Sequence, residues 1–214
     1  MFPKGVGMNG KIYLVPIGPV DENVLSMVGE GLATALMREW DVTDLLPHPA
    51  YAYHQRRQQY LSDAILSQLR QVALPAERLL GLVDLDLYTP GLNFVFGQAS
   101  MGGREALIAL PRLRPSFYGL LDDKALFHER AIKEAVHELG HTYGLGHCPD
   151  ATCVMHFSNS LPDTDFEIVP NYVLDHLFYG ISGILHSART ALCDKISQIG
   201  PCLGLWRKNM RSST

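Results

Sequence analysis

Three histidines and one glutamate lie close together in the run HELGHTYGLGH, which covers residues 137–147. In a helix, positions four apart lie roughly 40° apart around the axis and about 6 Å apart along it, so His137 and His141 can reach one metal ion. Imidazole nitrogen is a common ligand of zinc, and a catalytic zinc takes three protein ligands and leaves its fourth position to water or substrate. The spacing therefore predicts a hydrolytic zinc centre.

The third predicted ligand is His147, which lies beyond the reach of the helical face that carries the first two. Gly144 precedes it, and glycine readily adopts the left-handed conformation that ends a helix and turns the chain back. Glu138 lies beside the metal, where a carboxylate can take a proton from a water molecule acidified by zinc. An HExxH pattern alone can be an incidental pair on a surface helix, but the added glycine and third histidine favour a metal site.

The extended pattern HExxHxxGxxH is the ligand pattern of the metzincins, and here it runs into Cys148, Cys153 and Met155. This continuation, together with residues 82–99, resembles the archaemetzincins, a family of metallopeptidases. The resemblance covers about residues 10–190. It implies a catalytic Zn2+ held by the three histidines, Glu138 as general base and acid, and a peptide or protein substrate.

The resemblance also assigns roles to residues outside the ligand pattern. Met155 would be the methionine of a turn beneath the metal, where a soft thioether packs against the histidines without binding zinc. The strand that contains Phe96, Gly97 and Gln98 would bind an extended substrate through its backbone. An ordinary edge strand, protected by the next loop, is the alternative interpretation.

The chain departs from the archaemetzincin pattern at a second, structural zinc site. Members of the family usually carry a CxxC pair after the methionine, but those two positions are Val173 and His176 here. A four-cysteine site therefore cannot form as the family builds it. Cys148 and Cys153 can be packed thiols, which is the favoured interpretation. They can also bind a second Zn2+ with His176 and one further residue, or form a disulfide.

Composition and charge are typical of one folded domain. The chain has 214 residues, of which 47% are hydrophobic and 19% charged, and it can bury a substantial core. The formal net charge of −4 gives no basic footprint for nucleic acid. The first ten residues lack the pattern of a secretory signal, and the first apolar run, residues 12–17, is too short to span a membrane. We therefore expect a cytoplasmic protein without nucleic-acid or membrane partners, and its oligomeric state stays open.

The predicted elements begin with a strand, a helix and a second strand, a succession that implies parallel strands. These elements cover residues 11–17, residues 22–39 with Asp21 as N-cap, and residues 42–46. Further helices are predicted at residues 60–72, 123–143, 169–178 and 182–199, and further strands at 79–87, 93–99 and 106–113. The helix 123–143 carries the metal ligands.

The expected fold is α+β: a metzincin-like single domain with a mixed, mostly parallel β-sheet, an active-site helix and a C-terminal helical part. The domain would cover residues 11–190, between an N-terminal extension, 1–10, and a C-terminal extension, 191–214. The expected activity is metal-assisted hydrolysis of a peptide bond. Two alternatives stay open, a catalytically silent zinc-containing module that binds a peptide or protein, and a hydrolase of another amide. The carboxylate of Glu138 favours an enzyme, because binding alone does not need it.

Overall fold

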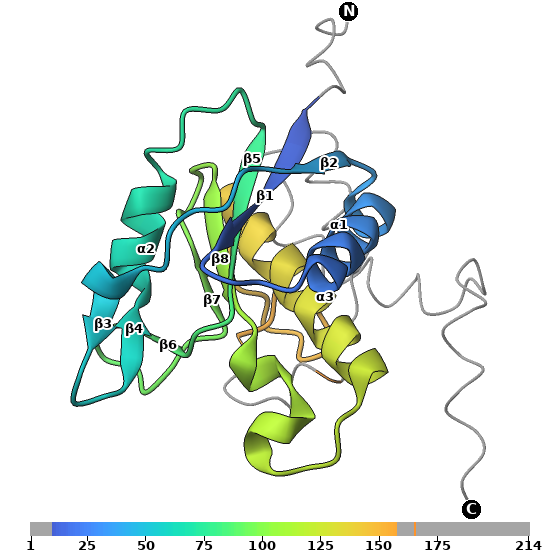
Figure 1. Ribbon diagram of the computed structural model, residues 1–214. Helices are drawn as coiled ribbons and strands as arrows, with labels where there is room; N and C mark the ends of the chain where they lie inside the picture. The colour runs from blue at the N-terminus through green and yellow to red at the C-terminus, as the bar shows by residue number, and fades with distance from the viewer. Residues whose placement is uncertain (1–9, 158–164, 166–214) are drawn as a thin grey trace, which may run out of the picture. The chain divides into compact units, whose positions relative to one another are not determined.

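A five-stranded sheet organises the part of the chain that the computed structural model describes, residues 10–157 and Asp165 (Figure 1). Its order is β2-β1-β5-β8-β7. The strands are β1 (Lys11–Ile17), β2 (Glu39–Val42), β5 (Arg78–Val83), β7 (Gly97–Ala99) and β8 (Glu105–Ala109). Strands β2, β1, β5 and β8 pair in parallel, and β7 pairs antiparallel with β8. The mixed, mostly parallel sheet confirms the expected fold class.

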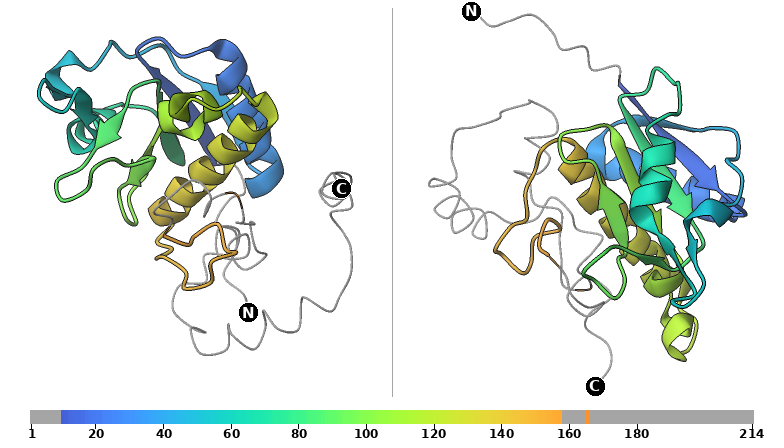
Figure 2. Two further views of the ribbon diagram at one scale, coloured as in Figure 1. Left: turned by 90° about the horizontal axis from the view of Figure 1, so that it is seen from below. Right: turned by 90° about the vertical axis from the view of Figure 1, so that its left-hand side faces the viewer.

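Helices cover both faces of this sheet (Figures 1 and 2). Helices α1 (Glu22–Leu36) and α3 (Lys124–Thr142) lie on one face, and α2 (Ser62–Leu69) lies on the other. Leu14 of β1 belongs to the core under α1 and α3, and Val15 belongs to the core under α2. Because both faces are buried at the centre of the sheet, β1, β5 and β8 are largely apolar and do not alternate with polar residues. Among the described helices, none is both long and apolar enough to cross a membrane.

The first β-α-β unit follows the prediction with shifted boundaries. Asp21 caps α1, since its Oδ1 accepts a hydrogen bond from the Asn23 backbone N–H at 2.8 Å. The helix ends at Leu36, three residues before the predicted end, because Met37 takes the left-handed conformation with φ 48°. Met37 itself is 73% exposed. Pairing of β2 with β1 therefore begins at Glu39, earlier than the predicted strand at 42–46.

A second, small sheet was not predicted. It has the order β3-β4-β6 and contains β3 (Tyr53–His54), β4 (Gln59–Leu61) and β6 (Leu87–Tyr88). The single strand predicted at 79–87 was wrong, because the chain leaves the large sheet after Val83 and enters the small one at Leu87. Asp84 and Asp86, between these strands, form ion pairs with arginines after β8. The helix predicted from residue 60 begins at Ser62, since the residues before it pair as β4.

The strands predicted at 93–99 and 106–113 are shorter in the structure. Only β7 is regular within the strand predicted at 93–99, and the strand predicted at 106–113 is β8 followed by a short 3-10 helix. The 3-10 helices are η1 (Ala50–Ala52), η2 (Pro111–Leu113) and η3 (Pro115–Tyr118). The helices predicted at 169–178 and 182–199 lie outside the described residues, and the proposed domain boundaries stay predictions.

Candidate active site

Helix α3 positions the predicted metal ligands. Its first turn is capped by Asp123, whose Oδ1 accepts a hydrogen bond from the Leu126 backbone N–H at 3.0 Å. At its other end Gly144 has a φ of +88°, which L residues rarely adopt. The backbone N–H of Gly144 donates to the His141 carbonyl at 2.9 Å, and that of Leu145 donates to the Gly140 carbonyl at 3.0 Å. This pair of bonds is a Schellman motif, which ends the helix where the sequence predicted and reverses the chain.

The reversal brings His137, His141 and His147 together. One potential ligand atom from each of the three side chains lies within 4.8 Å of the others. The Nε2 atoms of His137 and His141 are 3.0 Å apart. Among the described residues, this is the one group of three or more potential ligand side chains that lie this close together.

Two backbone carbonyls orient the first two imidazoles. The Nδ1 atoms of His137 and His141 each lie 2.7 Å from a carbonyl oxygen, that of Val154 and that of Leu145 respectively. A carbonyl can only accept, so each Nδ1 carries the hydrogen and each Nε2 keeps its lone pair. Such contacts behind a ligand fix both its tautomer and its direction. The lone pairs of the two Nε2 atoms are therefore available to a metal ion.

The environment also keeps the three imidazoles neutral. Burial, followed by the neighbouring His141, lowers the pKa of His137 to about 3. Burial likewise lowers the pKa of His141 and of His147. Neutral imidazole is the form that binds metals. Three neutral nitrogen donors that converge on one point fit the ligand set of a catalytic zinc.

The turn that contains Met155 packs against the same end of α3. Met155 is 1% exposed, and a Cβ added at Gly140 would lie 2.5 Å from its Sδ. Any larger residue at position 140 would therefore require the Met155 side chain to shift. The Cys148 backbone N–H donates to the Met155 carbonyl at 2.8 Å, which fixes the turn from the other side.

A cleft of about 440 Å³ opens beside the histidines. One wall is formed by residues 92–99, which include Phe96, Gly97 and Gln98, the residues predicted to bind substrate. Residues of α3, His147 and residues 156–157 complete the lining. Strand β7 is the last strand in the order of its sheet and therefore borders the cleft with one edge.

Glu138 is buried in the lining of this cleft, with 6% of its surface exposed. Burial, followed by the charge and hydrogen bond of Glu134, raises the pKa of Glu138 well above its ordinary value. Gly97 lies so close that an added Cβ would be 2.6 Å from Glu138 Cγ. The arrangement thus pairs a buried carboxylate of raised proton affinity with three neutral metal donors in one cleft.

The chain matches one protein family over more than half of its length. A sequence profile described as Peptidase family M54 matches residues 47–175. An archaemetzincin of Pyrococcus furiosus is 45% identical over 167 residues, which cover 75% of this chain and 87% of the relative. The chain belongs to peptidase family M54, the archaemetzincins. This membership makes it a zinc metallopeptidase and confirms the resemblance drawn from the sequence.

Solved structures agree with this assignment. The crystal structure of archaemetzincin from Methanopyrus kandleri is 38% identical, with a TM-score of 0.72, and the match covers 84% of this chain and 99% of that one. A zinc-dependent peptidase from Methanocorpusculum labreanum is 27% identical with a TM-score of 0.70, and the match covers 78% and 99% of the two chains.

The sequence assigned no role to three further side chains of this archaemetzincin. His156 lines the cleft, and its ring Nδ1 lies 3.0 Å from the Cys148 carbonyl oxygen. Glu134 also lines the cleft and was missed, although its position four residues before Glu138 places it on the same helical face. Tyr143 donates to Glu77 Oε1 at 2.7 Å and does not line the cleft.

The two cysteines lie at the edge of the site. Cys153 is buried, and its Sγ accepts a hydrogen bond from the Met155 backbone N–H at 3.3 Å. Cys148 is half-buried. His176, the predicted partner of both in a second zinc site, lies outside the described residues, so that site stays a prediction.

Proposed function

We propose that this archaemetzincin hydrolyses peptide bonds with a metal-activated water, using Glu138 as general base and acid. His137, His141 and His147 would hold one catalytic zinc ion. The observation that carries the proposal is the convergence of three neutral imidazoles beside a buried carboxylate in one cleft. When bound, zinc supplies Lewis acidity, which lowers the pKa of water and polarises a carbonyl group.

Glu138 is suited to move the proton. Its pKa is raised by burial and by Glu134, so its carboxylate binds a proton more readily than an exposed glutamate. A general base works best when its pKa lies near the working pH. Glu138 can therefore accept a proton from the attacking water and return it to the amine that leaves. No covalent bond between enzyme and substrate is needed.

Strand β7 can hold the substrate in an extended form. The Phe96 carbonyl accepts from the Ala109 N–H at 2.7 Å, and Gln98 lies opposite Leu107 in the register, so these residues turn their backbone groups towards β8. Backbone groups alternate along an antiparallel strand, and the N–H and C=O of Gly97 consequently point to the other edge. An extended peptide can add to that edge as a further strand. This geometry supports Phe96, Gly97 and Gln98 as the substrate-binding segment.

The test is cleavage of a mixed peptide library by the zinc-loaded enzyme, followed by mass spectrometry. Glu138→Gln keeps the size of the side chain but removes its basicity, and it should lower the rate by a factor on the order of 10² to 10⁴ with zinc still bound. Glu129→Gln is the matched control, because Glu129 lies on α3, pairs with Lys133 at 2.8 Å and does not line the cleft.

Each outcome has a direct meaning. Cleavage by Glu138→Gln at the wild-type rate would refute Glu138 as the general base. No cleavage by the wild-type enzyme with zinc bound would favour a catalytically silent binding module. Equal loss in both variants would point to a general weakening of α3.

A further inference from the structure

The lining of the cleft includes an irregular segment, residues 92–96, which we call the rim. It belongs to no helix or strand. Val95 forms an isolated bridge with Leu87, and the Phe96 carbonyl accepts from the Ala109 N–H. A segment without regular backbone pairing needs other contacts to keep one shape. The small sheet β3-β4-β6 and the chain after β8 supply them.

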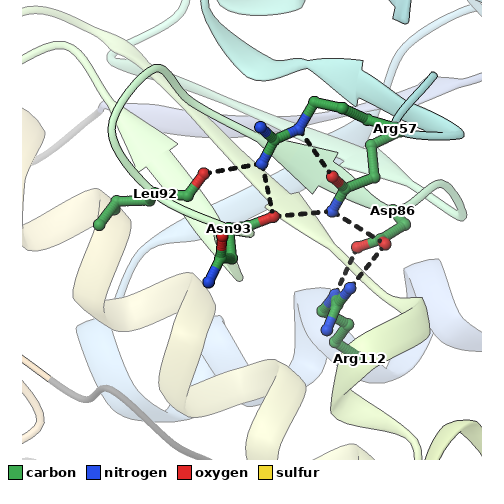
Figure 3. Close-up of polar contacts among 6 residues, drawn as sticks. Arg57, Asp86, Leu92, Asn93 and Arg112 are labelled. Carbon is green, nitrogen blue, oxygen red and sulfur yellow. Dashed lines mark hydrogen bonds and ion pairs between the residues drawn. The ribbon is translucent and has the colours of Figure 1, made fainter. Parts of the chain in front are cut away.

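The β3–β4 hairpin holds the backbone of the rim at its first two residues (Figure 3). Arg57 Nη2 donates to the Leu92 carbonyl at 2.9 Å and to the Asn93 carbonyl at 3.1 Å. Gln59 Nε2 donates to the same Asn93 carbonyl at 3.0 Å. Two side chains of one hairpin therefore meet two consecutive carbonyls of the rim.

The same network continues to an aromatic side chain of the rim. Gln59 is 7% exposed and also contacts Arg57 Nε, at 3.1 Å, and Asp86 Oδ2, at 3.1 Å. Asp86 in turn accepts two hydrogen bonds from Arg112, at 2.5 and 2.8 Å (Figure 3). The guanidinium of Arg112 lies over the Phe94 ring, 4.3 Å from its centroid. Paired arginine–carboxylate contacts of this kind fix direction as well as distance.

We propose that Arg57, Gln59, Asp86 and Arg112 form a clamp of positioning residues that holds the rim in the shape that receives the substrate. This inference rests on the proposed function, since it takes the cleft to be the place where a peptide binds. None of the four side chains lines the cleft, so their effect reaches the substrate through the rim. A rim that is already ordered loses less conformational freedom on binding, and this lowers KM more than it changes kcat.

Hydrogen exchange tests the clamp without any need for activity. The backbone N–H groups of Leu92 and Val95 donate to the carbonyls of Thr89 and Leu87, each at 3.1 Å, and therefore report opening of the rim. In the full-length, zinc-loaded protein, Arg57→Ala should accelerate exchange of the peptide 91–97 by about tenfold, from the loss of two hydrogen bonds.

Gln59→Leu should accelerate the same exchange, because it removes the link between the hairpin and Asp86. The control is Arg56→Ala, since Arg56 is exposed and makes no hydrogen bond or ion pair with the residues that the structure describes. Exchange of 91–97 at the wild-type rate in both Arg57→Ala and Gln59→Leu would overturn the clamp.

Kinetics test its role in binding. With a peptide cleaved by the wild-type enzyme, Arg57→Ala should raise KM roughly three- to tenfold and leave kcat within about twofold, with zinc content unchanged. Arg57→Lys keeps a cationic donor but loses the planar guanidinium with its several N–H groups, and it should give an intermediate KM. A role in stability alone would lower the melting temperature without this split between KM and kcat.

Two results separate the clamp from the proposed function. Faster exchange with an unchanged KM would overturn the positioning role. If the wild-type enzyme cleaved no peptide, the proposed function would fail, and the exchange of 91–97 would still decide whether the clamp holds the rim.

Discussion

Gly97 is the position where one methyl group should disturb catalysis most directly. In Gly97→Ala the new Cβ would lie 2.6 Å from Glu138 Cγ and 2.7 Å from the backbone oxygen of Leu107, whereas ordinary contact begins at 3.4 Å. The Leu107 oxygen belongs to β8, in the interior of the sheet, and cannot yield easily. Glu138 or β7 must therefore move by about 0.8 Å, the difference between 3.4 and 2.6 Å.

The size of the effect follows from that displacement. A misplacement of about 1 Å can cost on the order of 10² in rate, so kcat/KM of Gly97→Ala should fall by roughly that factor. Overpacking a well-filled site costs about 1–3 kcal/mol of unfolding free energy. Each kcal/mol lowers the Tm of a chain of this size by roughly 2–4 °C. Zinc content should stay at the wild-type level, because the three atoms nearest to the added Cβ belong to Glu138 and Leu107 and not to a histidine.

The assay compares kcat/KM, Tm and zinc content of the variant with those of the wild-type enzyme, using one peptide selected from the library. Gly146→Ala is the control, since a Cβ there meets no atom within 4 Å. Wild-type kcat/KM and Tm in Gly97→Ala would refute the packing of β7 against Glu138. Loss of zinc would show that the substitution acts on the ligands instead.

Three further predictions concern the metal, the pH dependence and the helix cap. His141→Ala should lose the zinc measured by atomic emission, whereas Glu138→Gln should keep about one ion per chain; full zinc in His141→Ala would disprove the ligand assignment. In the metal-free protein, the pKa of His137 is about 3 against 6.5 in the unfolded chain, so the unfolded state binds the proton first as pH falls. About 2 kcal/mol of unfolding free energy should therefore disappear between pH 7.5 and 5, and urea denaturation should show a smaller loss in His137→Gln. Asp123→Ala should lower the free energy of unfolding by about 1 kcal/mol in the same assay, because it removes the N-cap of α3. Asp122→Ala is the control, and equal urea midpoints for the two variants would contradict the cap.

The sequence predicted best the features whose signals are local. The bounds of α3 were accurate to within one residue at each end, because Asp123 caps its first turn and Gly144 ends its last. The convergence of His137, His141 and His147 follows from spacing on one helix and one turn, and the family comparison supports the enzyme class that this spacing indicated. In each case, the chemistry of a few neighbouring residues determines the backbone.

Features that depend on distant contacts could not be predicted in this way. The exit of the chain from the large sheet after Val83 coincides with ion pairs that join Asp84 and Asp86 to arginines 26 or more positions away. Residues 60 and 61 begin the helix that the apolar pattern predicted at 60–72, yet they pair as part of a strand with residues of β3 and β6. Glu134 escaped notice because a glutamate on a helix is usually exposed.

The two hydrogen-bond acceptors that orient His137 and His141 are backbone carbonyls. Side-chain substitutions therefore cannot remove them. A carboxylate in their place would be lost by a single substitution and would add negative charge to the ligands. The carbonyls of Leu145 and Val154 persist whatever side chain those positions carry. The acceptors behind His137 and His141 therefore add no charge to the site. Substitutions at Leu145 and Val154 should change the packing around the two imidazoles but not the direction in which their Nε2 atoms point.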